Sequence, residues 1–231
     1  MAQSDPALTA LLQRAEIRRA SELAKARTPG ISTGFASLDA ELPGGGWPSG
    51  VLTEILPAHE GIGELRLLSP ALATLSQRGL KLAWIAPPYL PYAPALVAAG
   101  IDLSTLMLVK TSAPTDSLWA AEQCLKSAAC AALLFWPHHK TTYTDLRRLQ
   151  LAAAETSTFI FLFRPPQTAQ SSSPAALRLK LAAASGGLSI HILKRRGLQL
   201  SHPLFLSPAP PHAMARPLLS SAPIRPESIA V

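Results

Sequence analysis

A glycine-bearing loop with the sequence PAHEGIGELRLL spans residues 57–68, between a strand-like run and a helix-like run. A loop in this place binds phosphate groups when its backbone amides face them, a lysine reaches the β and γ phosphates and a hydroxyl ligates magnesium. If Gly63 precedes the lysine position, that position holds Glu64 and the hydroxyl position holds Leu65. The alternative alignment, on Gly61, also supplies neither a lysine nor a hydroxyl.

Replacing an ammonium by a carboxylate reverses the electrostatic interaction with a triphosphate. Two unit charges about 4 Å apart interact by roughly 4 kcal/mol at an effective dielectric of about 20, so attraction becomes repulsion of similar size. Glu64 also has a structural interpretation, because an acid in the first turn of a helix is stabilised by the helix dipole by roughly 0.3–1 kcal/mol. We therefore predict that this degenerate phosphate loop (Gly61, Gly63, Glu64, Leu65) holds no nucleotide and that the chain uses no cofactor.

The segments around the loop alternate between strand and helix patterns, which predicts an α/β fold with a mainly parallel twisted sheet flanked by helices. Strands are expected at residues 50–56, 81–87, 106–110, 130–137, 157–164 and 188–197. Helices are expected at residues 64–79, 92–100, 116–129 (with Asp116 as N-cap), 144–155 and 173–187.

The length of 231 residues predicts one well-packed core, and 48% apolar with 15% charged residues excludes a wholly disordered chain. Residues 1–27 are expected to form an amphipathic helix, residues 28–206 the α/β domain, and the proline-rich residues 207–231 a disordered tail. No apolar stretch reaches the roughly 20 residues of a membrane helix, and no export signal is evident. We expect a cytoplasmic protein without membrane contact.

The sequence offers only weak signals for a metal site. Cys124 and Cys130 lie six positions apart in a helix-like segment, which predicts different helix faces, no mutual bridge and two buried free thiols. His138 and His139 follow a strand but have no cysteine or carboxylate at ligand spacing. We expect a polar loop there and no metal.

The stretch ISTGFASLDAELPGGGWPSGVLTEI, residues 31–55, resembles the opening of the RecA-type core, which leads into the first strand and its phosphate loop. The matching positions are Ser32, Thr33, Gly34, Leu38, Asp39, Gly45, Gly46, Pro48, Gly50, Glu54 and Ile55. The likeness continues more weakly through RGLKLAWI, AAGIDLSTLMLVK and LSIHILKRRG, and covers roughly residues 28–200. Within that superfamily the chain resembles the ImuA family, RecA-like accessory proteins of bacterial inducible mutagenesis, to which the SulA division inhibitors are related.

The resemblance also locates the other positions that a RecA-like enzyme needs. The strand that ends in a magnesium-holding Asp in such enzymes here ends with Trp136, and Pro87 and Pro88 stand where a water-activating Glu is expected. With the lysine and hydroxyl positions also replaced, we expect no ATP hydrolysis, no catalytic residues and no small-molecule substrate.

The resemblance implies an accessory subunit of translesion synthesis that is made during the DNA-damage (SOS) response. Its implied partners are an ImuB-like inactive Y-family polymerase subunit and an error-prone replicative-type polymerase. Two alternatives remain open. One is a SulA-like inhibitor of cell division that binds FtsZ, and the other is a nucleotide-binding switch that does not hydrolyse its ligand.

The two halves of the chain differ in charge. Residues 1–136 hold 10 Lys and Arg against 11 Asp and Glu, whereas residues 137–231 hold 11 against 3. The second half favours non-specific binding of DNA or an acidic partner. A merely solvated basic face is the alternative, because the basic stretch HILKRRGL (residues 191–198) lacks the interleaved aromatic residues that stack on bases. The candidate residues are Arg147, Arg148, Arg178, Lys180, Lys194, Arg195 and Arg196.

Two loops are candidates for contacts of other kinds. Residues 167–174, QTAQSSSP, lie where RecA-like recombinases carry a DNA-holding loop, but they contain no Lys or Arg, so a flexible connector is expected. Residues 86–94, APPYLPYAP, predict a stiff, exposed loop in which Tyr89 and Tyr92 contact a partner protein. The alternative for this loop is ordinary packing against the domain.

Overall fold

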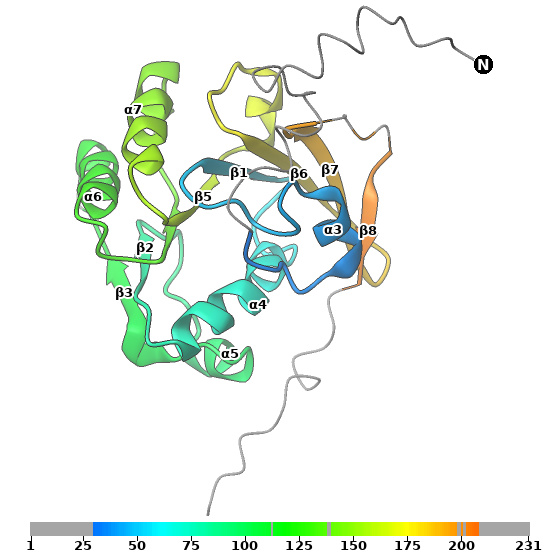
Figure 1. Ribbon diagram of the computed structural model, residues 1–231, viewed down its shortest axis with the longest axis horizontal. Coiled ribbons are helices and arrows are strands. Elements are labelled where there is room, and N and C mark those ends of the chain that lie inside the picture. The colour runs from blue at the N-terminus through cyan, green and yellow to red at the C-terminus, as the bar shows by residue number, and fades with distance from the viewer. Residues whose placement is uncertain (1–29, 112, 138–139, 198–199, 201, 208–231) are drawn as a thin grey trace, which may run out of the picture.

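The computed structural model describes residues 30–111, 113–137, 140–197, 200 and 202–207. The expected N-terminal helix, the pair His138 and His139, and the tail from residue 208 onward lie outside the described residues. The described part forms an α/β domain around one eight-stranded mixed sheet with helices on both faces (Figure 1). Within the same residues, no helix combines the length and apolar character needed to cross a membrane.

The sheet has the strand order β3-β2-β4-β5-β1-β6-β7-β8. Its strands are β1 (Leu52–Pro57), β2 (Leu82–Ile85), β3 (Leu106–Val109), β4 (Ala132–Phe135), β5 (Phe159–Phe163), β6 (Leu177–Ala184), β7 (Gly187–Lys194) and β8 (Leu204–Leu206). Neighbouring strands from β3 to β6 pair in parallel, whereas β7 is antiparallel to both β6 and β8. The expected mainly parallel sheet is therefore present, with an antiparallel extension at one edge.

The helices divide between the two faces of the sheet (Figure 1). They are α3 (Ala36–Glu41), α4 (Glu64–Gln77), α5 (Ala93–Ala98), α6 (Pro114–Lys126) and α7 (Tyr143–Ala154), with 3-10 turns η1 (Leu103–Thr105) and η2 (Pro166–Gln170). The core on the α4 side includes Leu72 of α4 with Ile55 and Leu179 of the sheet. The core on the α7 side includes Leu149 of α7 with Leu133 of β4. Central strands covered on both faces explain their nearly continuous apolar sequences.

The motif that carries the RecA-like resemblance has a structural role in this chain. The Asp39 carboxylate of α3 accepts hydrogen bonds from the Ser32 hydroxyl at 2.6 Å and from the Thr33 amide at 2.8 Å. A Cβ atom on Gly46 would lie 2.1 Å from the carbonyl oxygen of Ile31, so only glycine fits there. These contacts fold the segment before β1 onto itself.

The segment 173–187 is a correction to the predicted helix, because it forms β6 and the turn into β7. Its side chains follow a period of two: Leu177, Leu179 and Leu181 are buried in the α4-side core, while Arg178 lies between them on the other face. The run of alanines at 182–184 has a high helix propensity, which misleads a local prediction. Pairing with β1 and β7 overrides that propensity.

The end of α6 is a second correction. The helix begins at Pro114 with Ala113 as N-cap, so Asp116 lies in the first turn rather than at the cap. The helix ends at Lys126, and Cys130 therefore belongs to the turn before β4 and not to the helix. Helical spacing does not apply to the two cysteines, and their Sγ atoms lie 3.1 Å apart.

Candidate functional site

A cleft of about 400 Å³ opens at the carboxyl ends of four neighbouring strands, β2, β4, β5 and β1. Open α/β sheets bind their ligands at this edge. The loops after these strands line the cleft with Pro57, Ala58, His59, Glu60, Glu64, Ala86, Pro88, Trp136, Pro137, Phe163, Arg164, Pro165, Pro166 and Gln167. Glu64 and the two positions at which the RecA-like resemblance expects carboxylates, Pro88 and Trp136, therefore meet in one place.

The phosphate loop is occupied by a side chain of its own. The Glu64 carboxylate accepts a hydrogen bond from the Gly61 amide at 2.9 Å through Oε1 and another from the Gly63 amide at 3.1 Å through Oε2. Gly61 and Gly63 have φ angles of 80° and 111°, which glycine adopts without strain and which turn their amides toward the carboxylate. The loop still forms an anion-binding nest at the start of α4, and the anion is Glu64.

The floor of the cleft is aromatic where a magnesium site needs a carboxylate. Trp136, directly after β4, stacks on Phe163 with ring centroids 4.4 Å apart and planes 3° apart. Trp84 of β2 adds a tilted contact to Trp136 at 5.7 Å. Stacked rings contribute dispersion and burial, and they offer no oxygen ligand to a hard divalent cation.

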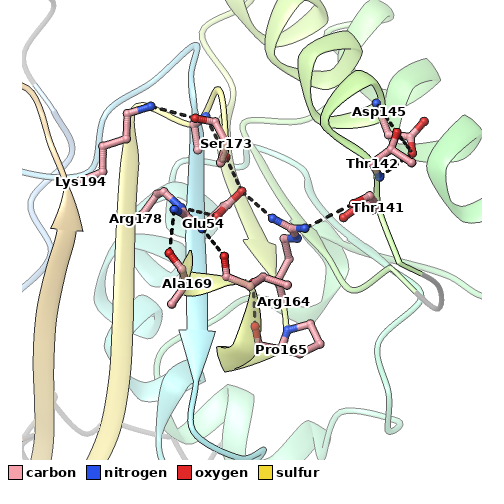
Figure 2. A network of polar contacts seen from close by, with 12 residues as sticks. Glu54, Thr141, Thr142, Asp145, Arg164, Pro165, Ala169, Ser173, Arg178 and Lys194 are labelled. Atoms are coloured by element: carbon pink, nitrogen blue, oxygen red, sulfur yellow. Dashed lines mark hydrogen bonds and ion pairs between the residues drawn. The ribbon is translucent and has the colours of Figure 1, made fainter. Parts of the chain in front are cut away.

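A buried ion cluster lies beside the cleft on the α7 side of the sheet (Figure 2). Glu54 of β1 is fully buried and accepts from Nε of Arg178 at 2.7 Å and from a terminal nitrogen of Arg164 at 3.2 Å. Both arginines are 6% exposed. One carboxylate therefore faces two guanidinium groups in the interior of the protein. Ionised groups are tolerated there only when their remaining donors and acceptors are satisfied.

Other donors of the two arginines bind backbone carbonyls of the surrounding loops. Arg178 donates to the carbonyl oxygen of Thr168 at 2.7 Å and to that of Ala169 at 3.2 Å. Arg164 donates to the carbonyl oxygen of Thr141, next to the N-cap of α7, at 3.4 Å (Figure 2). The cluster therefore fixes η2 and the start of α7 relative to β1, β5 and β6.

The loop after η2 is also held in place, which differs from the flexible connector expected for residues 167–174. The Ser173 hydroxyl donates to Glu54 Oε1 at 2.5 Å, and Lys194 donates to the Ser173 carbonyl oxygen at 2.9 Å (Figure 2). Neither contact could be predicted from the sequence around Ser173, because its two partners are 119 and 21 positions away in the chain. The segment lies over the ion cluster and covers it.

The structure separates the seven basic candidates into groups with different environments. Arg147, Lys180 and Arg196 are exposed. Arg148 pairs with Glu122 of α6, and Arg195 pairs with Glu41 at 2.7 Å. Lys194 is exposed and binds the loop at Ser173. Arg178 differs from all of them, because it is buried and its guanidinium is bound to Glu54 and to two carbonyl oxygens.

The loop after β2 presents apolar side chains to solvent. Tyr89 and Tyr92 are each 72% exposed, and Leu90 between them is 70% exposed. A hydrogen bond to the carboxylate of Glu60, a residue that lines the cleft, raises the pKa of Tyr89. Pro87, Pro88 and Pro91 restrict the backbone of this loop. The three exposed side chains therefore form a stiff apolar projection beside the cleft, which we call the 89–92 projection.

The described residues contain no group of three or more His, Cys, Asp or Glu placed to hold a metal ion. Among the described residues that line the cleft, Arg164 alone is an arginine or lysine, and its guanidinium is bound to Glu54. No protein-family model matches the chain, and no curated protein is significantly similar to it.

Proposed function

We propose that this chain is a non-catalytic, RecA-like accessory subunit of the ImuA kind, which acts in translesion DNA synthesis by binding proteins. Its partners in this proposal are an ImuB-like inactive Y-family polymerase subunit and an error-prone replicative-type polymerase, with non-specific DNA as a further ligand. The resemblance of residues 31–55 to the RecA-type opening supports the family part of the proposal, and the geometry of the cleft supports its non-catalytic part.

The observation that carries the non-catalytic part is the pair of hydrogen bonds from the Gly61 and Gly63 amides to Glu64. A nucleotide phosphate would need the same two amides, and it would have to displace a carboxylate tethered one residue away. Displacement also leaves that carboxylate close to the incoming phosphate, so Coulomb repulsion opposes binding. The same reason disfavours the alternative of a switch that binds a nucleotide without hydrolysing it.

The binding part of the proposal is supported by the 89–92 projection. Exposed aromatic and aliphatic side chains that are contiguous and rigid are typical of protein interaction sites, because little conformational entropy is lost when they become ordered in a complex. Tyrosine is also enriched in such sites, since its ring adds contact area and its hydroxyl keeps a hydrogen bond. We assign the first protein contact to Tyr89, Leu90 and Tyr92.

Affinity purification from cells with damaged DNA tests the partner assignment. The full chain carries a tag, complexes are crosslinked before lysis, and captured proteins are identified by mass spectrometry. We expect an ImuB-like subunit and a replicative-type polymerase to be enriched over an untagged control. Capture of FtsZ without either polymerase protein would contradict the proposal and favour the SulA-like alternative.

A further inference from the structure

The two cysteines lie next to each other at the turn between α6 and β4. Cys124 is in the last turn of α6, and Cys130 is two residues before β4. Between them Ala128 adopts a φ angle of 49°, in the left-handed region that non-glycine residues rarely occupy. This turn returns the chain so that the two Sγ atoms lie 3.1 Å apart.

The environments of the two thiols are unequal. Cys130 is 5% exposed in the α7-side core, whereas Cys124 is half-buried at the edge of that core. The hydrogen bond between them lowers the pKa of Cys124, while the same bond and burial raise the pKa of Cys130. An accessible thiol that ionises more readily therefore has a protected thiol beside it. This is the arrangement of an attacking and a resolving cysteine.

We propose that Cys124 and Cys130 form a dithiol–disulfide exchange site that takes disulfides of low molecular mass, or an accessible protein disulfide, as oxidant. The Cys124 thiolate attacks one sulfur of the oxidant, and the other sulfur leaves as a thiolate that takes up a proton. The Cys130 thiol then loses its proton and attacks Sγ of Cys124, which releases the second half of the oxidant as a thiol. The protein loses two electrons and two protons, and the oxidant is reduced to two thiols.

The surrounding contacts allow this bond without movement of the sheet. A disulfide needs the sulfurs at about 2.05 Å, so they must approach by about 1 Å. The Cys130 backbone is held by the Thr158 hydroxyl, which donates to its carbonyl oxygen at 2.8 Å. Cys124 lies in the final turn of a helix, where rotation of the side chain supplies the approach. The disulfide would close a ring through residues 124–130, around the turn at Ala128, and would hold the end of α6 against β4.

Exchange with glutathione tests the proposal on the full chain. The reduced protein is incubated with mixtures of reduced and oxidised glutathione, quenched with acid, alkylated and weighed intact by mass spectrometry. Because the chain has only two cysteines, a monomer that has lost two hydrogen atoms and accepts no alkyl group carries this bond. We expect this species to dominate for the wild-type protein. Persistence of the dithiol, or accumulation of glutathione adducts or dimers in its place, would overturn the proposal.

Two variants and one denatured control separate the roles of the sulfurs. Cys130→Ser is expected to retain one glutathione on Cys124, because no resolving thiol remains, and Cys124→Ser is expected to remain unmodified, because Cys130 is buried. For the wild-type protein, we compare the ratio of reduced to oxidised glutathione at which half of the disulfide is lost. This ratio should be about tenfold more reducing in buffer than in urea, because the fold holds the two thiols together. If the ratio in buffer were equal to that in urea, or less reducing, the fold would not favour the disulfide, and this result would contradict the proposal.

Discussion

The Glu54 carboxylate accepts a 2.7 Å hydrogen bond from Nε of Arg178, although the two residues are 124 positions apart in the chain. Both side chains are buried, and Arg164 joins them from the position directly after β5. The contact connects β1 with the strand at the start of the antiparallel extension, and through Arg178 it fixes the loop that contains η2. One carboxylate therefore binds side chains from β6, from the end of β5 and from the loop after η2.

Replacing that carboxylate should be costly. Glu54→Gln leaves two buried guanidinium groups without a counter-charge, and removal of one partner from a buried ion pair typically costs about 3–5 kcal/mol. We expect the free energy of unfolding in urea to fall by that amount. Glu155→Gln, at an exposed position after α7, is the matched control and should change it by less than about 0.5 kcal/mol. Equal effects of the two variants would contradict the structural role of the cluster.

Glu122 predicts a specific dependence of stability on pH. Its pKa is lowered mainly by the hydrogen bond from Lys126 and further by Arg148, against the opposing effect of burial. A carboxyl whose pKa is lower in the folded protein than in the unfolded chain stabilises the fold at pH values above its ordinary pKa of about 4.3. This contribution is lost as the pH falls through the pKa of the folded protein.

Glu122→Gln should therefore lower the free energy of unfolding near neutral pH by about 1 kcal/mol, because its partners are half-exposed and partly screened. The difference between wild type and variant should shrink as the pH is lowered toward about 3. Urea titrations at several pH values measure it. A difference that stays constant or grows in acid would contradict the assignment.

The 89–92 projection should affect binding without affecting folding. Tyr89→Ser combined with Tyr92→Ser removes two exposed rings, and exposed substitutions usually change stability by less than about 0.5 kcal/mol each. We expect unchanged urea unfolding together with at least about tenfold weaker capture of the ImuB-like partner. Tyr143→Ser, an exposed tyrosine on α7, is the control and should retain capture. Loss of capture in the control alone would move the interface to α7.

Any DNA binding should depend on charge and not on sequence. We expect weak affinity whose logarithm falls linearly with the logarithm of salt concentration, and each exposed phosphate contact that is removed should reduce that slope by about 1. Lys180→Ala and Arg147→Ala are the informative variants, and Lys81→Ala, at the amino end of β2, is the control. Fluorescence anisotropy with unrelated DNA sequences measures this. Affinity retained at high salt would indicate direct base contacts.

Local sequence patterns predicted the elements whose stabilising contacts follow their own periodicity. The strand expected at 130–137 contains β4, and the strand expected at 50–56 covers β1 except for its last residue, Pro57. The helix expected at 64–79 contains α4, because buried apolar runs and helical spacing are visible within each segment. The β6 strand was missed because its alanines favour a helix, while the pairing with β1 and β7 that decides the outcome lies elsewhere in the chain.

The sequence places Glu64 at the lysine position of the expected phosphate loop, but it does not show what that side chain binds. Residue type alone suggested a dipole effect, whereas the structure places both carboxylate oxygens on loop amides. The fate of Arg178 was also hidden, since a basic residue between leucines is typical of an exposed position on an amphipathic helix. Its partner Glu54 looked like part of an apolar strand, and only the sheet register brings the two together.

We infer that Glu64 occupies the loop amides of Gly61 and Gly63 and thereby excludes nucleotide. Isothermal titration calorimetry of the full chain with Mg-ATP tests it most directly, with Glu64→Ala as the variant that frees the amides while leaving the rest of the cleft unchanged. We predict no heat of binding for the wild-type protein. Micromolar affinity of the wild-type protein for Mg-ATP would contradict the account.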